Sequence, residues 1–241
     1  MNILGIIPAR YASTRFPGKP LVLINGKTMI ERVYEQACKS KLLSDVIVAT
    51  DDERIYETVG NFGGKVMYTS ANHKNGTERC AEIATKSTAD FIINIQGDEP
   101  FISPEQIDLL ASCIRNTSSP IATLIMPHAP NAALADSSRI KVVVNKTMQA
   151  MYFSRSMIPF ARNESNVTFY KHIGLYAFKK EALLSLIKLE PTLLEETESL
   201  EQLRWLENGY SIQCAVTEIE SISIDTPEDL QNVLLKVNSN N

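Results

Sequence analysis

The sequence predicts a doubly wound α/β fold built on a mostly parallel, mixed sheet. In the first half of the chain, short apolar runs alternate with amphipathic stretches. This is the spacing of parallel strands joined by crossover helices. After about residue 120 the strand-like runs follow one another with fewer helices between them. The second half therefore favours an antiparallel excursion from the same fold.

The elements expected in the first half follow from the period of their apolar residues. In the stretch after Lys27, four side chains share one helical face at positions i, i+3, i+4 and i+7, namely Ile30, Val33, Tyr34 and Ala37. Ser103 followed by Pro104 is typical of a helix N-terminus. Strands are expected over residues 2–8, 45–50, 65–69 and 91–96, and helices over 27–41, 51–62, from about 77, and over 103–115.

The second half has mainly strand-like patterns. Strands are expected over residues 120–126, 140–145, 169–178 and 210–216, an alternating strand over 221–224, and helices over 195–209 and 226–237. The segment 151–162 is expected to form a small antiparallel lobe or a dimerisation arm. Because no repeat or low-complexity linker divides the chain, we expect one domain over residues 1–241, with about 120–180 forming its elaborated half.

The composition is that of an ordinary globular protein and excludes several classes. The formal net charge of −4 argues against a general binder of nucleic acid or membrane surfaces, since such proteins are usually basic. The four cysteines include no C-x-x-C pair, which favours reduced thiols over disulfides or a zinc site. The N-terminal apolar run is too short for a signal peptide or a membrane span. We therefore expect a cytoplasmic protein.

A cationic loop follows the first predicted strand. It carries Arg10, Arg15 and Lys19, with Pro17 and Gly18 just before the lysine. It matches neither the dinucleotide fingerprint nor the P-loop, so a nicotinamide-dependent oxidoreductase is not indicated. Guanidinium groups can each donate two hydrogen bonds to phosphate oxygens, and a lysine can add a point charge. The loop therefore suits a triphosphate, while the alternative is a turn with three solvated cations.

Two further segments carry carboxylates. In "NIQGDEP", Gln96, Gly97 and Asp98 follow an apolar strand, where a carboxylate can hold Mg²⁺ while phosphates complete its coordination shell. In "IDTPEDL", Asp225 can supply a second carboxylate. Structural alternatives exist for both, because Asp98 fits a turn, and Asp225 or Thr226 fits a helix N-cap. Taken together, two carboxylates and three cations indicate nucleotidyl transfer.

With these segments the chain resembles the 3-deoxy-manno-octulosonate cytidylyltransferases, which make CMP-Kdo from CTP and the acidic sugar Kdo. The resemblance extends nearly end to end. It includes "PARYASTRFPGKPL", "VATDDERI", "NGTERCAE", "NIQGDEPFI", "AMYFSRSMIPF", "HIGLYAF", "ESLEQLRWLENG" and "IDTPEDL". The first and fourth of these in that order are highly specific for the family. The resemblance implies CTP and Kdo as substrates, Mg²⁺ as cofactor, a homodimer, and a sugar-binding and dimerisation half around residues 120–180.

The resemblance also implies roles for individual residues. The residues that bind CTP would be Ala9, Arg10, Ser13, Arg15, Lys19, Gln96 and Gly97. Mg²⁺ would be bound by Asp98 and Asp225, and the catalytic set would be Arg10, Lys19, Asp98 and Asp225. Kdo would be bound by Arg79, Gln96, Arg155, His172, Tyr176 and Glu198. Without the resemblance, His172 is more simply a core histidine and Glu198 a solvated helix charge.

The sequence departs from the family pattern at two places. Asn75 replaces the usual serine before "GTER", and Ser223-Ile224 replace the usual glycine-valine before "DTPED". These departures weaken the choice of sugar acid more than the choice of reaction. A transferase for an amino-substituted Kdo or a sialic acid is one alternative. A silent nucleotide-binding module is another, although it predicts loss of a metal carboxylate or of the phosphate lysine, and both are present.

Overall fold

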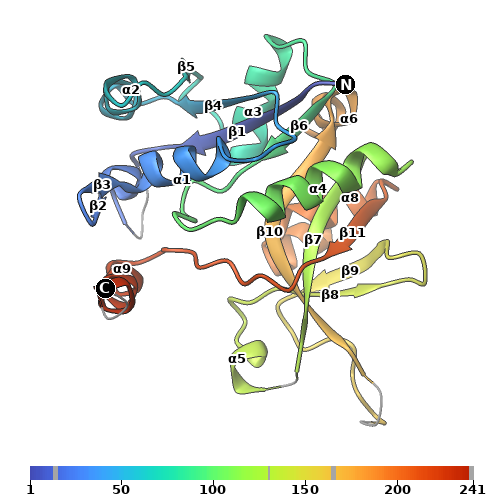
Figure 1. The fold of residues 1–241 in the computed structure, drawn as a ribbon. Helices are drawn as coiled ribbons and strands as arrows, with labels where there is room; N and C mark the ends of the chain where they lie inside the picture. Colours follow the sequence, from blue (N-terminus) through green and yellow to red (C-terminus); the bar gives the residue numbers. More distant parts are fainter. Residues whose placement is uncertain (13–15, 130, 164–166, 239–241) are drawn as a thin grey trace. The chain divides into compact units, whose positions relative to one another are not determined.

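A computed structural model describes residues 1–12, 16–129, 131–163 and 167–238 of the chain (Figure 1). These residues form two compact units, one of Met1–Asp108 with Ser221–Asn241 and one of Leu109–Glu220. The expected fold class is confirmed, since parallel and antiparallel strands are combined and flanked by helices. The single domain expected over the whole chain stays a prediction. No helix within the described ranges is long and apolar enough to cross a membrane.

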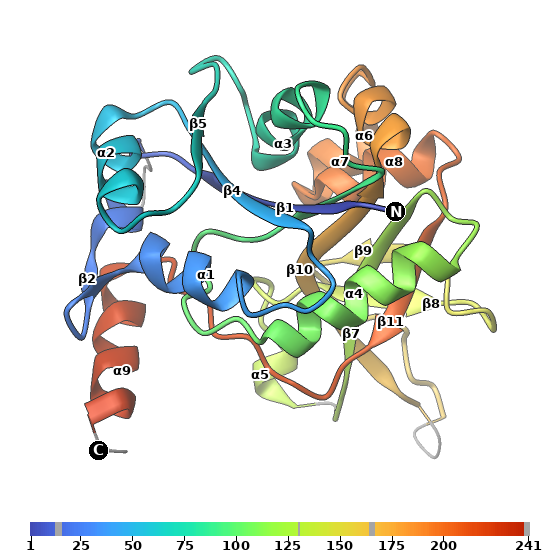
Figure 2. The same cartoon turned by 45° about the horizontal axis from the view of Figure 1, so that its top comes forward.

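The first unit is built on four parallel strands. Their order is β6 (Phe91–Asn94), β1 (Ile3–Ala9), β4 (Asp45–Thr50) and β5 (Val66–Tyr68). The central strand β1 is buried on both faces, as expected for a strand with helices on either side. Figure 2 shows α3 (Gly76–Thr85) and α1 (Met29–Ala37) on opposite sides of β1 and β4, with α2 (Glu53–Asn61) near the end of β4.

The helices of this unit begin where the sequence offers a side-chain cap. The side chain of Thr28 accepts a hydrogen bond from Glu31 N at the start of α1. Asp52 and Asn75 cap α2 and α3 in the same way. Each cap satisfies a backbone N–H that has no partner within its helix. All three helices fall within the ranges expected from the sequence, apart from one residue at the start of α3.

A short hairpin between β1 and α1 was not expected from the sequence. It consists of β2 (Leu23–Ile24) and β3 (Lys27–Thr28), and it follows the single-turn 3-10 helix η1 (Lys19–Leu21). Its turn residues Asn25 and Gly26 have φ angles of 47° and 80°. An Asn-Gly pair is the strongest local signal for such a turn, so the sequence carried evidence for this hairpin.

The second unit has a mixed sheet. Strand β7 (Ile121–His128) pairs antiparallel with β10 (Phe169–Lys179) and parallel with β11 (Ile212–Val216). Strand β8 (Lys141–Val144) pairs antiparallel with β10 and with β9 (Ala150–Ser154). The antiparallel excursion expected after residue 120 is therefore confirmed. Helices α5 (Ala132–Ala135) and α6 (Lys180–Leu186) also belong to this unit, while α4 (Pro104–Asn116) crosses the boundary between the units.

The helix expected over residues 195–209 is wrong as one continuous element. The chain instead forms α7 (Leu193–Glu198) and α8 (Glu201–Glu207), separated by Ser199 and Leu200, and Ser199 has the left-handed conformation with φ 51°. Arg155 explains the break, because its side chain donates hydrogen bonds to the carbonyl oxygens of Glu198 and Ser199. After the break, α8 carries Trp205 into the core, where it packs edge-on against Tyr176 at 5.1 Å between ring centroids.

The strand expected over residues 221–224 is also wrong. This segment has no regular secondary structure and leads directly into α9 (Pro227–Asn238). Its alternating pattern still has a physical meaning, because Ile224 is fully buried while Ile222 is 41% exposed. Ile224 and Val233 pack against Ile24 and Met29 of the first hairpin and α1. This cluster fixes the end of the chain to the segment that follows η1.

Ile224→Ala should lower the free energy of unfolding by about 2–5 kcal/mol, since it removes most of a fully buried side chain. Urea denaturation followed by circular dichroism measures this. Leu235→Ala is the matched control, because Leu235 lies in α9 and is 70% exposed. That change should shift the free energy of unfolding by no more than about 0.5 kcal/mol. Equal effects of the two changes would contradict the importance of this cluster.

Candidate active site

A cavity of about 340 Å³ lies within the first unit, at the carboxyl ends of β1 and β6. Such an edge of a parallel sheet is where open α/β folds bind ligands. The lining residues come from the ends of these strands, from η1, from the start of α3 and from the segment before α9. They are Pro8, Ala9, Arg10, Lys19, Pro20, His73, Lys74, Asn75, Gly76, Arg79, Gln96, Gly97, Asp98 and Asp225.

The centre of this site is the ammonium group of Lys19. Its Nζ donates a hydrogen bond to Asp98 Oδ2 at 2.7 Å and to Asp225 Oδ1 at 3.2 Å. The two carboxylates thus converge on one positive charge, which offsets the repulsion between them. The structure thus brings Asp98 and Asp225 together through Lys19, while their predicted role as a metal-binding pair stays a prediction.

The capping of α9 leaves the Asp225 side chain directed at Lys19. Thr226 is the N-cap, since its Oγ1 accepts a hydrogen bond from Asp229 N at 3.2 Å. Asp229 reciprocates, and its Oδ2 accepts hydrogen bonds from the backbone N–H groups of Asp225 and Thr226. Ile224 N also donates to Asp98 O at 2.9 Å, which joins the backbones of the two acidic segments. Of the two caps the sequence allowed, the structure selects Thr226.

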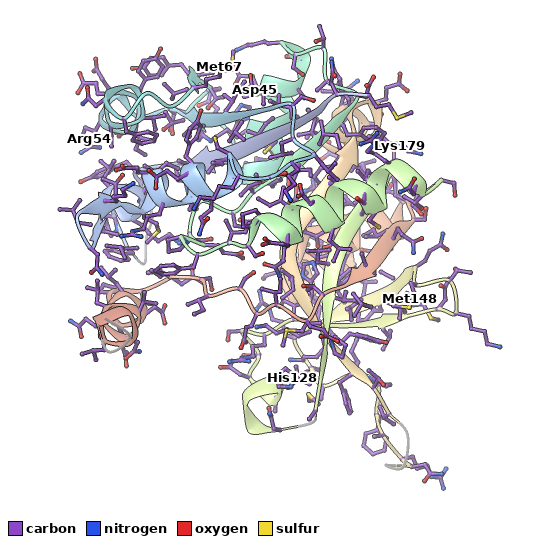
Figure 3. All side chains as sticks on the ribbon, in the orientation of Figure 1. Asp45, Arg54, Met67, His128, Met148 and Lys179 are labelled. Carbon is purple, nitrogen blue, oxygen red and sulfur yellow. The ribbon has the colours of Figure 1, made fainter. Side chains whose placement is uncertain are left out.

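The loop after β1 is closed by Tyr11 and Gly18. Gly18 N donates to Tyr11 O at 2.9 Å, and Gly18 has a φ of 72°, in the left-handed region that favours glycine. A side chain at Gly18 would also meet the Tyr11 ring at 3.1 Å. Arg54, which is labelled in Figure 3, lies over the same ring, with its Cζ 3.2 Å from the ring centroid. The predicted residues Ser13 and Arg15 lie outside the described residues, whereas Arg10 lines the cavity and is exposed.

Gly97 is required by the close approach of two backbone segments. A Cβ atom at this position would lie 3.0 Å from Pro8 O. Real Cβ contacts are rarely so short, so a larger residue would push the β6 loop away from β1. That loop carries both Gln96 and Asp98. Gly97 thereby keeps Asp98, the predicted metal ligand, beside the end of β1.

Arg79 forms another wall of the cavity and is only 4% exposed. Its guanidinium donates a short hydrogen bond to Thr69 Oγ1 and forms an ion pair with Asp51 Oδ1 at 3.1 Å. Removing one partner of a buried ion pair is usually costly, because the other charge is left uncompensated. Asp51 and Thr69 follow β4 and β5, so two strand ends fix this arginine.

Beside Arg79, the segment 70–74 is attached to α3 by two glutamates. Glu82 Oε2 accepts hydrogen bonds from Ser70 N at 2.8 Å and contacts His73 Nε2 at 2.7 Å. The Lys86 ammonium, together with Ser70 N–H and the His73 ring, lowers the pKa of Glu82 to about 2. Glu78 Oε2 accepts from Lys74 N at 2.8 Å.

Sequence reasoning missed the cavity residues His73, Lys74 and Gly76, and also Asp51 and Thr69, which hold Arg79. One local sequence signal indicated where α3 begins. Asn75 stands three residues before Glu78, a spacing typical of a helix N-cap.

The described residues contain no group of three or more histidine, cysteine, aspartate or glutamate side chains arranged to hold a metal. The Asp98 and Asp225 pair nevertheless fits Mg²⁺. Their oxygens already converge on one cation, and magnesium usually takes one or two protein carboxylates and completes its shell with phosphates and water. The two carboxylates line a cavity that Arg10 also lines, and this cavity has room for the phosphates and water that would complete the shell.

The residues predicted to bind the sugar, other than Arg79 and Gln96, lie in the second unit and form two groups. In the first group, Glu198 accepts hydrogen bonds from Ser154 Oγ at 2.6 Å and from Arg155 N at 2.9 Å. Burial raises the pKa of Glu198, but these hydrogen bonds outweigh burial and leave its pKa below the ordinary value. The Arg155 side chain donates to the carbonyl oxygens of Ser137, Glu198 and Ser199.

The second group consists of His172 and Tyr176 on β10. The His172 ring lies 5.2 Å from Tyr176 and 5.1 Å from Phe153, and its Nε2 lies 2.9 Å from Thr123 Oγ1. Although the residue keeps some exposed surface, burial of the ring lowers its pKa to about 3, so the ring is neutral at neutral pH. The buried Tyr176 hydroxyl has no hydrogen-bond partner among the described residues. Since buried hydroxyls are nearly always paired, this group suits a ligand.

Comparison with known proteins gives consistent matches. A family model described as Cytidylyltransferase matches residues 4–219. The 3-deoxy-manno-octulosonate cytidylyltransferase of Bacteroides thetaiotaomicron is 53% identical over 243 residues, covering 96% of each chain. That of Fusobacterium nucleatum is 50% identical and covers 100% of this chain and 99% of its own. The solved structure of CMP:2-keto-3-deoxy-manno-octonic acid synthetase complexed with CTP has a TM-score of 0.95 and 40% identity over the whole of both chains.

His172 should make the stability of the protein depend on pH. An unfolded histidine binds a proton below its ordinary pKa of 6.5, whereas the folded one does so only near pH 3. Its contribution is therefore complete above about pH 6.5 and is lost as the pH falls toward 3. Between pH 7 and 5 the free energy of unfolding of the wild type should fall by about 2 kcal/mol more than that of His172→Gln. Urea denaturation at both pH values measures this, and equal pH dependence in the two proteins would contradict it.

Proposed function

The chain belongs to the cytidylyltransferase family and, within it, to the 3-deoxy-manno-octulosonate cytidylyltransferases, and from that membership we propose how its residues handle the two substrates. The enzyme transfers the cytidylyl group of CTP to Kdo, giving CMP-Kdo and pyrophosphate. The observation that carries the residue assignments is the convergence of Asp98, Asp225 and Lys19 in one cavity at the carboxyl ends of β1 and β6.

We assign the cationic end of this cavity to the phosphates of CTP. Lys19 is held in place by two carboxylates and Arg10 is exposed, so both can donate to phosphate oxygens. Donors placed before the reaction begins stabilise negative charge as it develops on the α-phosphate and on the departing pyrophosphate. Ala9, Gln96 and Gly97 line the same cavity and are assigned to CTP as well. Ser13 and Arg15 stay predictions from the family resemblance.

We assign the metal-binding role to Asp98 and Asp225. When bound there, Mg²⁺ supplies Lewis-acid stabilisation of phosphoryl charge. The protein's own contribution is to hold the two carboxylates together, through Lys19 and through the backbone bond from Ile224 N to Asp98 O. No general base is assigned, and the Kdo C2 hydroxyl attacks the α-phosphorus in line with the departing pyrophosphate.

We assign the carboxylate and hydroxyl groups of Kdo to Arg155, His172, Tyr176 and Glu198. The buried Tyr176 hydroxyl, which has no hydrogen-bond partner in the described part of the chain, supports a polar ligand beside β10. The neutral His172 ring, with Nε2 near Thr123, can exchange hydrogen bonds with a sugar hydroxyl without adding charge. Arg79 and Gln96 line the cavity in the first unit and stay predicted contacts to the sugar.

We further propose that the product serves lipopolysaccharide synthesis, as the family resemblance implies, and that the enzyme acts in the cytoplasm as a homodimer without nucleic-acid or membrane partners. The four cysteines are all free thiols, which is consistent with a reducing compartment. A second acidic sugar such as an amino-substituted Kdo remains the alternative substrate. Asn75, which departs from the family's usual serine, lines the cavity and keeps that alternative open.

The substrate assignment predicts a clear pattern of pyrophosphate release. Purified protein with Mg²⁺ should release pyrophosphate from CTP and Kdo. The rate of release should be at least about 100-fold lower when ATP, GTP or UTP replaces CTP. Sialic acid and 8-amino-Kdo test the sugar preference in the same assay. Release only with another acid would keep the reaction and overturn the choice of sugar. No release with any pair would overturn the enzymatic function.

The metal assignment predicts that Asp98→Asn lowers kcat by at least about 100-fold, comparable to loss of one charge-stabilising group in other enzymes. It should also raise the Mg²⁺ concentration needed for half-maximal rate. Glu228→Gln is the matched control, because Glu228 is an exposed acid three residues after Asp225, and it should leave both values within about twofold. Chelation with EDTA should abolish the wild-type rate, and added Mg²⁺ should restore it. An unchanged magnesium dependence in Asp98→Asn would contradict the assignment.

A further inference from the structure

Lys141, the first residue of β8, is a lysine with no exposed surface. Its ammonium forms no ion pair with a carboxylate within the described part of the chain. Instead, Nζ donates to the backbone carbonyl oxygens of Asp136 at 3.1 Å, of Arg139 at 2.7 Å, and of Arg155 through a short hydrogen bond. Three acceptors satisfy the three N–H groups of an ammonium. Burial lowers the pKa of Lys141, partly offset by the negative charges of Asp136 and Glu198.

A buried charge at this position needs an explanation beyond packing. Moving an ammonium out of water is unfavourable by several kcal/mol unless its surroundings compensate. A methionine of similar length would fill the same space without that cost. The charge is useful because it binds three backbone carbonyl groups at once. Asp136 and Arg139 belong to one turn, and Arg155 directly follows strand β9. One side chain therefore ties this turn to the backbone of Arg155, in addition to the pairing of Lys141 with Ser154 between β8 and β9.

Arg155 connects this ammonium to Glu198. The Arg155 carbonyl accepts from Lys141, and the Arg155 N–H donates to Glu198 Oε2 at 2.9 Å. The Arg155 side chain returns to the same region, donating to Ser137 O at 3.0 Å and to Glu198 O at 2.7 Å. The turn around Ser137 is thus held by both cations, Lys141 and Arg155. A change at Lys141 would reach the Glu198 carboxylate through the backbone of a single residue, Arg155.

We propose that Lys141 is a positioning residue for the acidic sugar, acting through the backbone of Arg155 on the side chains of Arg155 and Glu198. The inference rests on the proposed function, in which these two residues contact Kdo. It assigns Lys141 no contact with the substrate. Its effect should be confined to the sugar, because the cavity assigned to CTP is lined entirely by residues of the other unit.

The test is a pair of Michaelis constants measured on Lys141→Met. The KM for Kdo should rise by about tenfold or more, since small errors in positioning have large effects on reacting groups. The KM for CTP should stay within about twofold. Because KM does not depend on the fraction of protein that is active, partial unfolding does not produce this difference. Lys146→Met is the matched control, as Lys146 is exposed in the turn after β8, and it should change neither constant.

Two further variants sharpen the comparison. Lys141→Arg keeps the charge but moves the donor atoms, so it should raise the KM for Kdo less than Lys141→Met, and it replaces that variant if the latter fails to fold. Glu198→Gln combined with Lys141→Met should raise the KM for Kdo by less than the product of the single effects, because both act on one network. When Lys141→Met is instead combined with Asp98→Asn, the effects of the two single changes on the KM for Kdo should multiply.

Each other outcome overturns the inference in a recognisable way. Unchanged constants in both lysine variants would mean that Lys141 positions nothing of importance for the reaction. An equal rise in both constants would mean a general structural role. A wild-type protein that releases no pyrophosphate from CTP and Kdo would overturn the proposed function itself, and the role of Lys141 toward Kdo with it.

Discussion

The hydrogen bonds from Lys19 to Asp98 and Asp225 are the interaction on which the rest of the site depends. They join segments separated by 79 and 206 residues along the chain. Two carboxylates this close would repel each other, and the ammonium offsets that repulsion before any substrate arrives. The surrounding structure serves this contact. Gly97 allows the β6 loop to approach β1, Gly18 sets the start of η1, and the packing of Ile224 brings the C-terminal segment to the same point.

The parallel strands and their helices were predictable from the sequence because their signals are local. Strand β4 occupies residues 45–50 as expected, and α1, α2 and α4 lie within one residue of their expected ranges or inside them. The break at Ser199 was not predictable, because its cause is Arg155, which is 44 residues away. The coil at 221–224 has the same explanation. The alternation of its apolar residues arises because Ile224 packs against distant residues, and not because the segment pairs with a neighbouring strand.

The candidate site follows the same division. Arg10, Lys19, Asp98 and Asp225 stand in recognisable motifs, and the structure brings them into one cavity. Family resemblance, and not local chemistry, indicated Arg155, His172, Tyr176 and Glu198. Asp51 and Thr69 carry no local sign of importance, since their role is to hold Arg79 from two other strands. Residues that act through another side chain are the least visible in a sequence, because nothing in their own neighbourhood requires them.

Lys19 and Lys141 show two uses of one side chain within the same protein. Lys19 neutralises two carboxylates and keeps part of its surface open, so its charge remains accessible to phosphate groups. Lys141 is fully buried and forms no ion pair with a carboxylate of the described residues; it binds three backbone carbonyl groups and fixes the backbone of Arg155. A lysine suits both sites because its ammonium is a compact charge with three donors, whereas the planar fork of arginine would impose its own directions on the partners. The surroundings, and not the residue type, decide whether the charge is available to substrate or reserved for structure.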